Sequence, residues 1–283
     1  MPKVGTFDLV REASFQHVGI GAFNVIHLET AEALIDGAEQ AKLPMILQLS
    51  HNCIRFHNDQ LAPIGKALIE LAERSTVPIA VHLDHCESVI LAKQAIDLGF
   101  DSVMYDGSTL DFEENVLATR AVVDYAHRTG VSVEAELGEI GGKGAHCPGV
   151  KTDPEEAKLF VSNTGVDGLA VAVGNEHAMQ ERTAKLDLEL ISRLKASAGV
   201  PLILHGSSGV PDEEIQRGIA AGMTKINVST HFNGYFTRAL REYFDANPSV
   251  IDSRKYMSYA RKAVAAEAKR LLEVFRNPLP ASD

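Results

Sequence analysis

The sequence predicts an α/β fold, a (β/α)8 or TIM barrel, because short apolar segments alternate with longer amphipathic segments eight times. The short segments consist mainly of Val, Ile, Leu and Ala, as do parallel strands that are covered on both faces. No Pro/Ser-rich linker divides the 283 residues, and barrels of this length commonly form one domain. We therefore predict a single (β/α)8 domain over residues 1–283, with an extra helix at its C-terminal end.

Each predicted strand is followed by a predicted helix. The strands are expected at residues 19–26, 44–50, 78–85, 102–106, 131–137, 168–173, 201–205 and 225–229. The helices are expected at residues 30–41, 62–74, 88–98, 112–128, 154–164, 186–196, 212–221 and 231–247, and the extra helix at 253–275. Several helices end at a glycine, the usual C-terminal stop: Gly99, Gly130, Gly165, Gly199 and Gly222.

A doubly wound open sheet is the alternative arrangement of alternating strands and helices. The dinucleotide-binding form of that sheet carries Gly-x-Gly-x-x-Gly after an early strand, and this sequence has no such motif there. We therefore favour the barrel. In a barrel the C-terminal ends of all strands meet at one mouth, so side chains at those ends converge.

The composition excludes some classes of partner. The chain has 38 acidic and 27 basic residues, a net charge of −11, which argues against nucleic acid as a ligand. The three cysteines, Cys53, Cys86 and Cys147, are too few for a disulfide framework and predict a cytoplasmic location. No apolar run approaches the roughly 18 residues of a membrane-spanning helix, so no membrane association is expected.

Three histidines follow apolar strands and predict a metal site. His85, His177 and His205 end the third, sixth and seventh predicted strands, so all three face the barrel mouth. Three protein ligands that leave one position open for substrate are typical of catalytic rather than structural zinc.

Two loops next to these histidines predict a phosphate site. His205 leads directly into Gly206-Ser207-Ser208-Gly209, and the last strand leads into Asn227-Val228-Ser229-Thr230 before a helix. The loops after strands seven and eight, with a helix N-terminus, are where barrels of this kind bind phosphate. An ordinary glycine turn and a helix cap are the alternative interpretation.

Carboxylates also gather at the predicted strand ends. Asp84 precedes His85 and could act as an acid or base, provided that the end of the strand turns both side chains inward. Asp106 ends the fourth strand, and Glu134 and Glu136 share one face of the fifth strand, inside the barrel. Buried carboxylates need a metal, a cation or hydrogen-bond donors.

Other polar side chains near these strand ends have simpler interpretations. His82 is expected inside the barrel or behind the metal ligands, and Cys86 is expected to pack in the core rather than bind metal. Asn24, at the end of the first strand, could reach the mouth.

Several of these motifs occur together, in the same order, in one known family. They are His82-Leu83-Asp84-His85, Phe112-Glu113-Glu114-Asn115-Val116, Val133-Glu134-Ala135-Glu136-Leu137-Gly138, Leu204-His205-Gly206-Ser207-Ser208-Gly209 and Lys225-Ile226-Asn227-Val228. The chain resembles the class II, metal-dependent fructose-bisphosphate and tagatose-bisphosphate aldolases from Gly21 to the C-terminal helix.

The resemblance implies a role for each matching residue. It implies a zinc ion on His85, His177 and His205, with Asp106 and Glu136 matching positions that hold a second or displaced cation. Asp84 matches the acid/base carboxylate. The positions matching the substrate and phosphate site are Asn24, Ser50, Gly206, Ser207, Ser208, Asn227, Val228, Ser229 and Thr230. Arg254 matches an arginine that meets the distal phosphate, in some members across a dimer interface.

The implied function is that of a lyase of carbohydrate metabolism and glycolysis. A zinc-dependent aldolase would cleave a ketose bisphosphate reversibly into dihydroxyacetone phosphate and an aldehyde phosphate, in the cytoplasm and as a homodimer or higher oligomer. Two alternatives stay open. One is an aldolase acting on a deoxy-keto sugar-acid phosphate, and the other is a sugar-phosphate-binding protein that has lost catalysis.

Three positions depart from the family pattern. Ala178 stands where the family usually has a phosphate-contacting glycine, and Cys86 stands where it usually has glycine. The loop after the fifth strand has no acidic residue after Glu139, so we hypothesise that Glu139 or His146 takes over the proton transfer of the missing acid.

Overall fold

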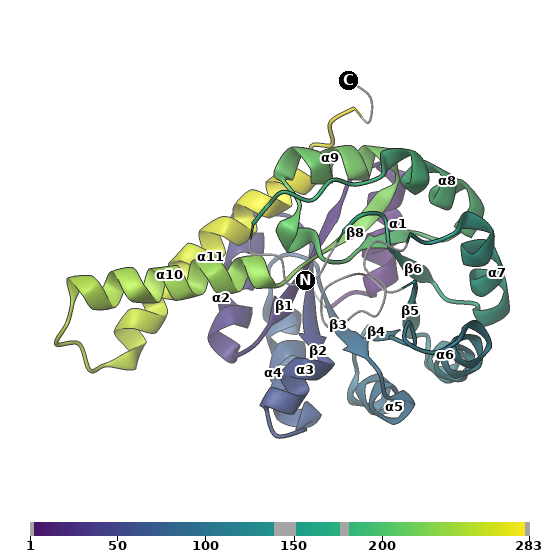
Figure 1. Ribbon diagram of the computed structural model, residues 1–283. Coiled ribbons are helices and arrows are strands. Elements are labelled where there is room, and N and C mark those ends of the chain that lie inside the picture. Colours follow the sequence, from purple (N-terminus) through teal and green to yellow (C-terminus); the bar gives the residue numbers. More distant parts are fainter. Residues whose placement is uncertain (1–2, 139–150, 176–180, 281–283) are drawn as a thin grey trace.

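The computed structural model describes residues 3–138, 151–175 and 181–280, and these contain a closed barrel of parallel strands (Figure 1). Each strand pairs with the next, and β8 pairs with β1, so the predicted barrel is confirmed and the open sheet is excluded. The strands are β1 (Ile20–Val25), β2 (Met45–Ser50), β3 (Ile79–Cys86), β4 (Ser102–Tyr105), β5 (Ser132–Leu137), β6 (Gly168–Val171), β7 (Leu202–Leu204) and β8 (Met223–Val228).

Helices surround the barrel, and most of them coincide with the predicted ones. They are α2 (Leu28–Ala41), α4 (Leu61–Arg74), α5 (Val89–Leu98), α6 (Phe112–Ala126), α7 (Pro154–Thr164), α8 (Leu188–Ala198), α9 (Asp212–Ala221), α10 (Thr230–Ala246) and α11 (Ser253–Phe275). Short 3-10 turns occur at η1 (His127–Thr129) and η2 (Ser207–Gly209). Gly99, Gly165 and Gly199 follow α5, α7 and α8 with positive φ, as predicted.

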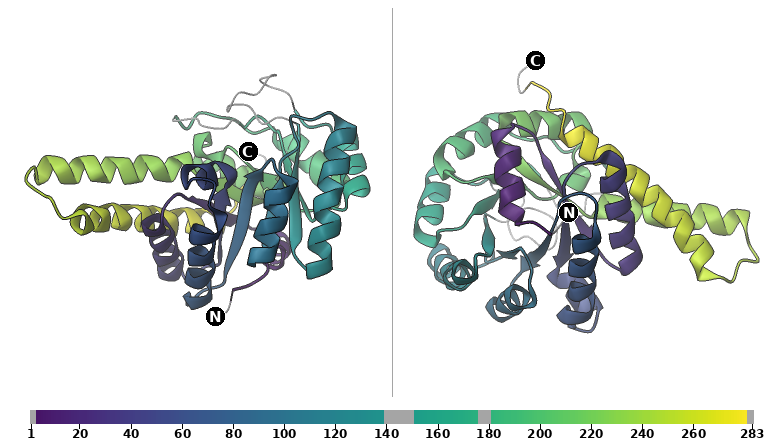
Figure 2. Two further views of the ribbon diagram at one scale, coloured as in Figure 1. Left: turned by 90° about the horizontal axis from the view of Figure 1, so that it is seen from below. Right: turned by 180° about the vertical axis from the view of Figure 1, so that it is seen from behind.

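Two helices were not predicted from the sequence. One is α3 (His51–Phe56), a short helix that begins where the Ser50 side chain accepts a hydrogen bond from the Cys53 amide. The other is α1 (Thr6–Phe15), which precedes the first strand. Its buried Phe7 and Val10 pack against residues from the first three strands, in a cluster separate from the main core. In the right-hand view of Figure 2, α1 lies in front of the strands. It therefore covers the end of the barrel at which the strands begin.

The last two long helices form an arm that projects from the barrel (Figure 1). Tilted aromatic pairs join α10 to α11 near the tip, Tyr243 with Tyr259 and Phe244 with Tyr256. Nearer the barrel, α11 packs closely on α2, where a Cβ added to Gly37 would come within 2.6 Å of the Ala265 carbonyl oxygen. The base of the arm is thus fixed to the barrel, whereas its tip stands clear of it.

Glu267 links the two helices of the arm at its base. Its carboxylate contacts His231 of α10 at 2.6 Å and Arg270 at 2.7 Å, and Arg270 also pairs with Asp212 of α9. Burial opposes the ionisation of Glu267, but the hydrogen bonds from Arg270 and His231 outweigh it and lower its pKa to about 2.

We expect Glu267→Gln to lower the free energy of unfolding by about 1–3 kcal/mol at pH 7, since it weakens charged hydrogen bonds. A carboxylate with a lowered pKa stabilises the fold above its unfolded pKa, and this stabilisation is lost as the pH falls towards 2. The difference between wild type and variant should therefore shrink between pH 5 and pH 3, as measured by urea unfolding. Glu273→Gln, on the exposed side of α11, serves as the control. A difference independent of pH would contradict this account.

Candidate active site

The end of β3 turns two neighbouring side chains towards the mouth. His85 has a φ of +47°, in the left-handed region, and the pairing of β3 with β4 shifts register between Leu83 and Cys86. A regular strand would direct Asp84 and His85 to opposite faces. Both line the pocket at the mouth. The irregularity at His85 therefore turns both side chains inward, as an acid/base role of Asp84 beside a metal-bound His85 requires.

The tautomer of His85 follows from its contact with Asp106. The Nδ1 atom lies 2.7 Å from the Asp106 Oδ2 atom, and the other carboxylate oxygen accepts hydrogen bonds from the Ser108 amide and hydroxyl. Burial opposes the ionisation of Asp106, but the contacts with His85 and Ser108 outweigh it and lower its pKa. Because an ionised carboxylate only accepts, Nδ1 of His85 carries the proton, and Nε2 of the neutral ring presents a lone pair.

The same reasoning applies to His205, which follows β7. Its Nε2 atom lies 2.9 Å from the Glu134 Oε1 atom, and Lys225 donates to the other oxygen of Glu134 at 2.8 Å. Burial opposes the ionisation of Glu134, but Lys225 and His205 lower its pKa to about 2. The proton of the His205 ring is therefore on Nε2, and Nδ1 presents a lone pair in the neutral ring.

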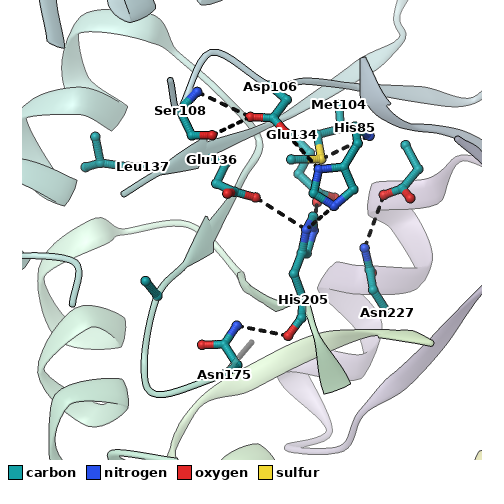
Figure 3. A network of polar contacts seen from close by, with 12 residues as sticks. His85, Met104, Asp106, Ser108, Glu134, Glu136, Leu137, Asn175, His205 and Asn227 are labelled. Carbon is teal, nitrogen blue, oxygen red and sulfur yellow. Dashed lines mark hydrogen bonds and ion pairs between the residues drawn. The ribbon is translucent and has the colours of Figure 1, made fainter. Parts of the chain in front are cut away.

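The two lone pairs face each other. His205 Nδ1 and His85 Nε2 are 2.9 Å apart, and the rings point towards one another in Figure 3. Two facing lone pairs repel unless a cation or a proton lies between them. Burial and the neighbouring His85 lower the pKa of His205, which disfavours the proton. Two imidazole nitrogens and a nearby carboxylate are suitable ligands for zinc and similar divalent ions. The residues present therefore fit a metal ion.

Two groups of possible ligands overlap at this point. Ligand atoms of Asp84, His85 and His205 lie within 4.8 Å of one another, and so do those of His85, Asp106 and Glu136. Glu136 also approaches His205, with its Oε2 atom 3.4 Å from Nδ1. The described part of the structure thus brings together four of the five predicted metal ligands. The fifth, His177, lies outside the described residues, as do Glu139, His146, Cys147 and Ala178.

Asp84 is held by two amides. Asn24 donates to its Oδ2 atom at 2.7 Å and Asn227 to its Oδ1 atom at 3.3 Å, while Gln48 donates to the Asn24 carbonyl at 3.1 Å. Burial opposes the ionisation of Asp84, but the positive charge that His85 and His205 carry when protonated, together with that of Lys225, outweighs burial and lowers its pKa. Asp84 is therefore ionised at neutral pH, held in place, and able to accept a proton.

The predicted phosphate loops lie side by side. The Ser208 hydroxyl oxygen accepts hydrogen bonds from the amides of Ser229 and His231, at 3.4 and 3.3 Å. Ser207 donates to the Asn227 carbonyl, which ties the loop after β7 to the end of β8. Gly206 has a φ of +61°, a conformation that glycine adopts without strain. Backbone amides and the N-terminus of α10 are thus gathered where an anion would be favoured.

Most predicted site residues reach this one pocket. It is lined by Asn24, Ser50, Asp84, His85, His205, Gly206, Ser208, Asn227, Ser229 and Thr230. Ser207 and Val228 are buried next to it, and the Val228 side chain packs in the hydrophobic core. Arg254 lies elsewhere, at the start of α11 near the tip of the arm (Figure 1), where it pairs with Asp252.

Several polar side chains of the site were missed from the sequence. Lys225 and Gln48 are fully buried inside the barrel, and Asn175 donates to the His205 carbonyl at 2.9 Å. The period-two pattern of a strand could have revealed the first two, because Lys225 shares a face with Asn227 and Gln48 shares one with Ser50. Two other interpretations are confirmed, since His82 is buried in the interior and Cys86 belongs to the hydrophobic core.

Comparison with known protein families identifies the family to which this chain belongs. A family model described as fructose-bisphosphate aldolase class-II matches residues 4–278. The chain belongs to this family. The match confirms the resemblance that the sequence motifs indicated, and with it the class of enzyme, a class II aldolase.

Relatives named fructose-bisphosphate aldolase and a solved aldolase structure match over almost the whole length. A fructose-bisphosphate aldolase of Geobacillus stearothermophilus is 41% identical over 271 residues, covering 94% of each chain. One of Staphylococcus aureus is 36% identical, covering 97% of this chain and 98% of the relative. The YdjI aldolase of Escherichia coli K12 has a TM-score of 0.86 at 33% identity, with 98% of each chain covered.

Proposed function

We propose that this class II aldolase binds one catalytic zinc ion and reversibly cleaves a ketose bisphosphate of the fructose-1,6- or tagatose-1,6-bisphosphate type. The products would be dihydroxyacetone phosphate and an aldehyde phosphate. The observation that carries the proposal is the facing pair His85 Nε2 and His205 Nδ1, beside the ionised Asp84 and next to the phosphate loops. A binding protein would not require this combination of metal ligands and base.

The residues of the mouth can perform the cleavage as follows. Asp84 takes the proton from the C4 hydroxyl as the C3–C4 bond breaks, and C4 becomes the carbonyl carbon of the aldehyde. The electron pair of that bond stays on the three-carbon product, and Asn227, next to Asp84, positions that product. A bound metal ion held by His85, His177 and His205 would supply Lewis-acid polarisation of the C2 carbonyl. We assign the later proton transfer to C3 to Glu139 or His146.

A second cation is also part of the proposal. Ligand atoms of Asp106 and Glu136 lie within 4.8 Å of one another beside His85, so these two carboxylates would hold a divalent or monovalent cation next to the catalytic ion. Cys53 and Cys86 are directed elsewhere, because the Cys53 thiol donates to the Ile26 carbonyl and the Cys86 thiol to the Ser88 carbonyl. We propose a cytoplasmic location for the enzyme. No helix in the described segments is long and apolar enough to cross a membrane.

Arg254 points to an oligomer. Its side chain is 88% exposed at the tip of the arm, away from the mouth of its own barrel. If Arg254 binds the distal phosphate of the substrate, it must therefore do so at the mouth of another subunit. We propose a homodimer or higher homo-oligomer in which the arm brings Arg254 to a neighbouring site.

Ser208→Ala should raise KM for a phosphorylated ketose about tenfold, the equivalent of one hydrogen bond of about 1.4 kcal/mol. The Ser208 oxygen accepts from two amides, so its own proton is directed away from them and can be donated to a phosphate. Metal content should not change. Ser162→Ala, on the exposed side of α7, is the matched control. An unchanged KM would show that the Ser208 side chain does not contribute to phosphate binding.

One experiment separates the candidate substrates. Retro-aldol cleavage of fructose bisphosphate, tagatose bisphosphate and a deoxy-keto sugar-acid phosphate is measured by the release of the three-carbon product. The proposal expects turnover of at least one of the two bisphosphates. Turnover of the sugar acid alone would favour that alternative, and its three-carbon product need not carry phosphate. Absence of turnover on all three would favour the binding protein.

A further inference from the structure

We propose that Glu134 is a positioning residue, whose carboxylate holds the His205 ring so that Nδ1 faces the metal, while Lys225 holds that carboxylate in place. The inference rests on the metal site of the proposed function. It assigns a role to Glu134, Lys225 and His82, three side chains of the barrel interior that neither bind metal nor contact substrate in that proposal.

These three side chains, and the metal ligand His205 beside them, are completely enclosed. Glu134, Lys225, His82 and His205 each have 0% exposed surface, and they come from β5, β8, β3 and the end of β7. Glu134 lies at their centre, 2.9 Å from His205 Nε2, 2.8 Å from Lys225 Nζ and 3.6 Å from His82 Nε2. Removing two charges from water costs several kcal/mol per ion, so such a pair adds little net stability over apolar side chains of similar size. A role in orientation explains its presence better.

The orientation concerns the two edges of one imidazole ring. Glu134 contacts the Nε2 edge of His205, while Glu136, two residues along the same strand, approaches the Nδ1 edge together with His85. A carboxylate that accepts from Nε2 fixes the tautomer in which Nδ1 is the metal ligand, and such hydrogen bonds also fix the direction of the ring. The two glutamates of β5 therefore act on opposite edges of His205.

His82 lies on the third side of Glu134, but it carries no positive charge that would pair with the carboxylate. Burial and Lys225 lower the pKa of His82 to about 3, so His82 is neutral and Lys225 supplies the balancing cation. On its other side, His82 Nδ1 lies 2.6 Å from the Ser102 hydroxyl, which lies 2.6 Å from the Thr6 hydroxyl of α1. Hydrogen-bond contacts thus run from α1 through Ser102 to His82, whose Nε2 atom lies 3.6 Å from Glu134 and has no hydrogen-bond partner among the described residues.

Paired substitutions separate orientation from charge balance. E134L/K225M removes the ion pair and the acceptor together, whereas E134Q/K225M removes the charges and keeps an acceptor for His205. We expect both to unfold in urea at concentrations close to wild type. We expect E134L/K225M to bind zinc about 10–100-fold more weakly, as losing the partner of a metal-bound histidine does. E134Q/K225M should stay within about threefold of wild type, since it keeps that hydrogen bond. The measurements are zinc Kd by chelator competition and the visible spectrum of the cobalt-substituted proteins.

Two results would overturn the inference. One is a folded E134L/K225M with the zinc Kd and cobalt spectrum of wild type, and the other is an equal loss of affinity in both variants. If E134L/K225M does not fold, nitrogen-15 NMR of the histidines in the metal-free wild type decides. His205 protonated on Nε2 supports the proposal, and His205 protonated on Nδ1 refutes it. Tight zinc binding by a wild type without aldolase turnover would refute the proposed function and leave this inference intact.

Discussion

Asp84→Asn should lower kcat for retro-aldol cleavage by about 10²–10⁴-fold, the usual contribution of a positioned general base. The amide keeps the shape of the carboxylate, and its oxygen can accept from one of the two donors, Asn24 or Asn227, but it cannot take the proton of the C4 hydroxyl. KM should change little, because the phosphate loops are untouched. The measurement is steady-state kinetics at pH 7.5 with the metal content determined on the same samples.

Asp101→Asn is a matched control for this experiment. Asp101 is another aspartate of the barrel, partly buried, but it precedes β4 at the opposite end, where it accepts from the Val81 amide and pairs with Lys3. Its substitution should affect stability rather than kcat. If Asp84→Asn turned over substrate at more than a tenth of the wild-type rate with metal bound, Asp84 would not be the base.

His205→Ala is expected to reduce turnover by about 10³-fold or more, as several kcal/mol of metal-assisted stabilisation are lost. The variant removes one side of the facing nitrogen pair and leaves Glu134 without the imidazole on which it acts. Metal content after dialysis should fall well below one ion per chain, as measured by atomic emission.

His127→Ala provides the comparison for His205. His127 also contacts a carboxylate, Asp167 at 2.9 Å, but it follows α6 and lies outside the mouth pocket. The His127→Ala variant should retain metal and activity. A His205→Ala variant that kept one metal ion per chain and near-normal turnover would exclude His205 as a ligand.

The barrel could be predicted from the sequence because its signals are local and repeated. Apolar strands such as β2 and glycine stops such as Gly165 depend on residues that are close in sequence. By contrast, α1 has no strand before it, and the burial of Phe7 and Val10 depends on strands that lie far along the chain. A search of the sequence for strands that are each followed by a helix therefore does not identify α1.

The part of the candidate site that lies at the ends of strands could be predicted from the sequence. Asp84, His85 and His205 were placed at the mouth by position alone, and the structure brings them together. The conformation of His85 could not be foreseen, because a positive φ outside glycine is set by the surrounding fold rather than by the residue. The partner of Lys225 could not be foreseen either, since Glu134 lies 91 residues away along the chain.

Titration of the metal-free protein with zinc tests the central claim most directly. Retro-aldol turnover of a ketose bisphosphate is followed at each addition, with bound zinc measured in parallel. We expect turnover to be absent without metal, to rise in proportion to bound zinc and to reach its plateau at one catalytic ion per chain. Full turnover in the metal-free protein, or one bound ion per chain without cleavage of any ketose phosphate, would contradict the account.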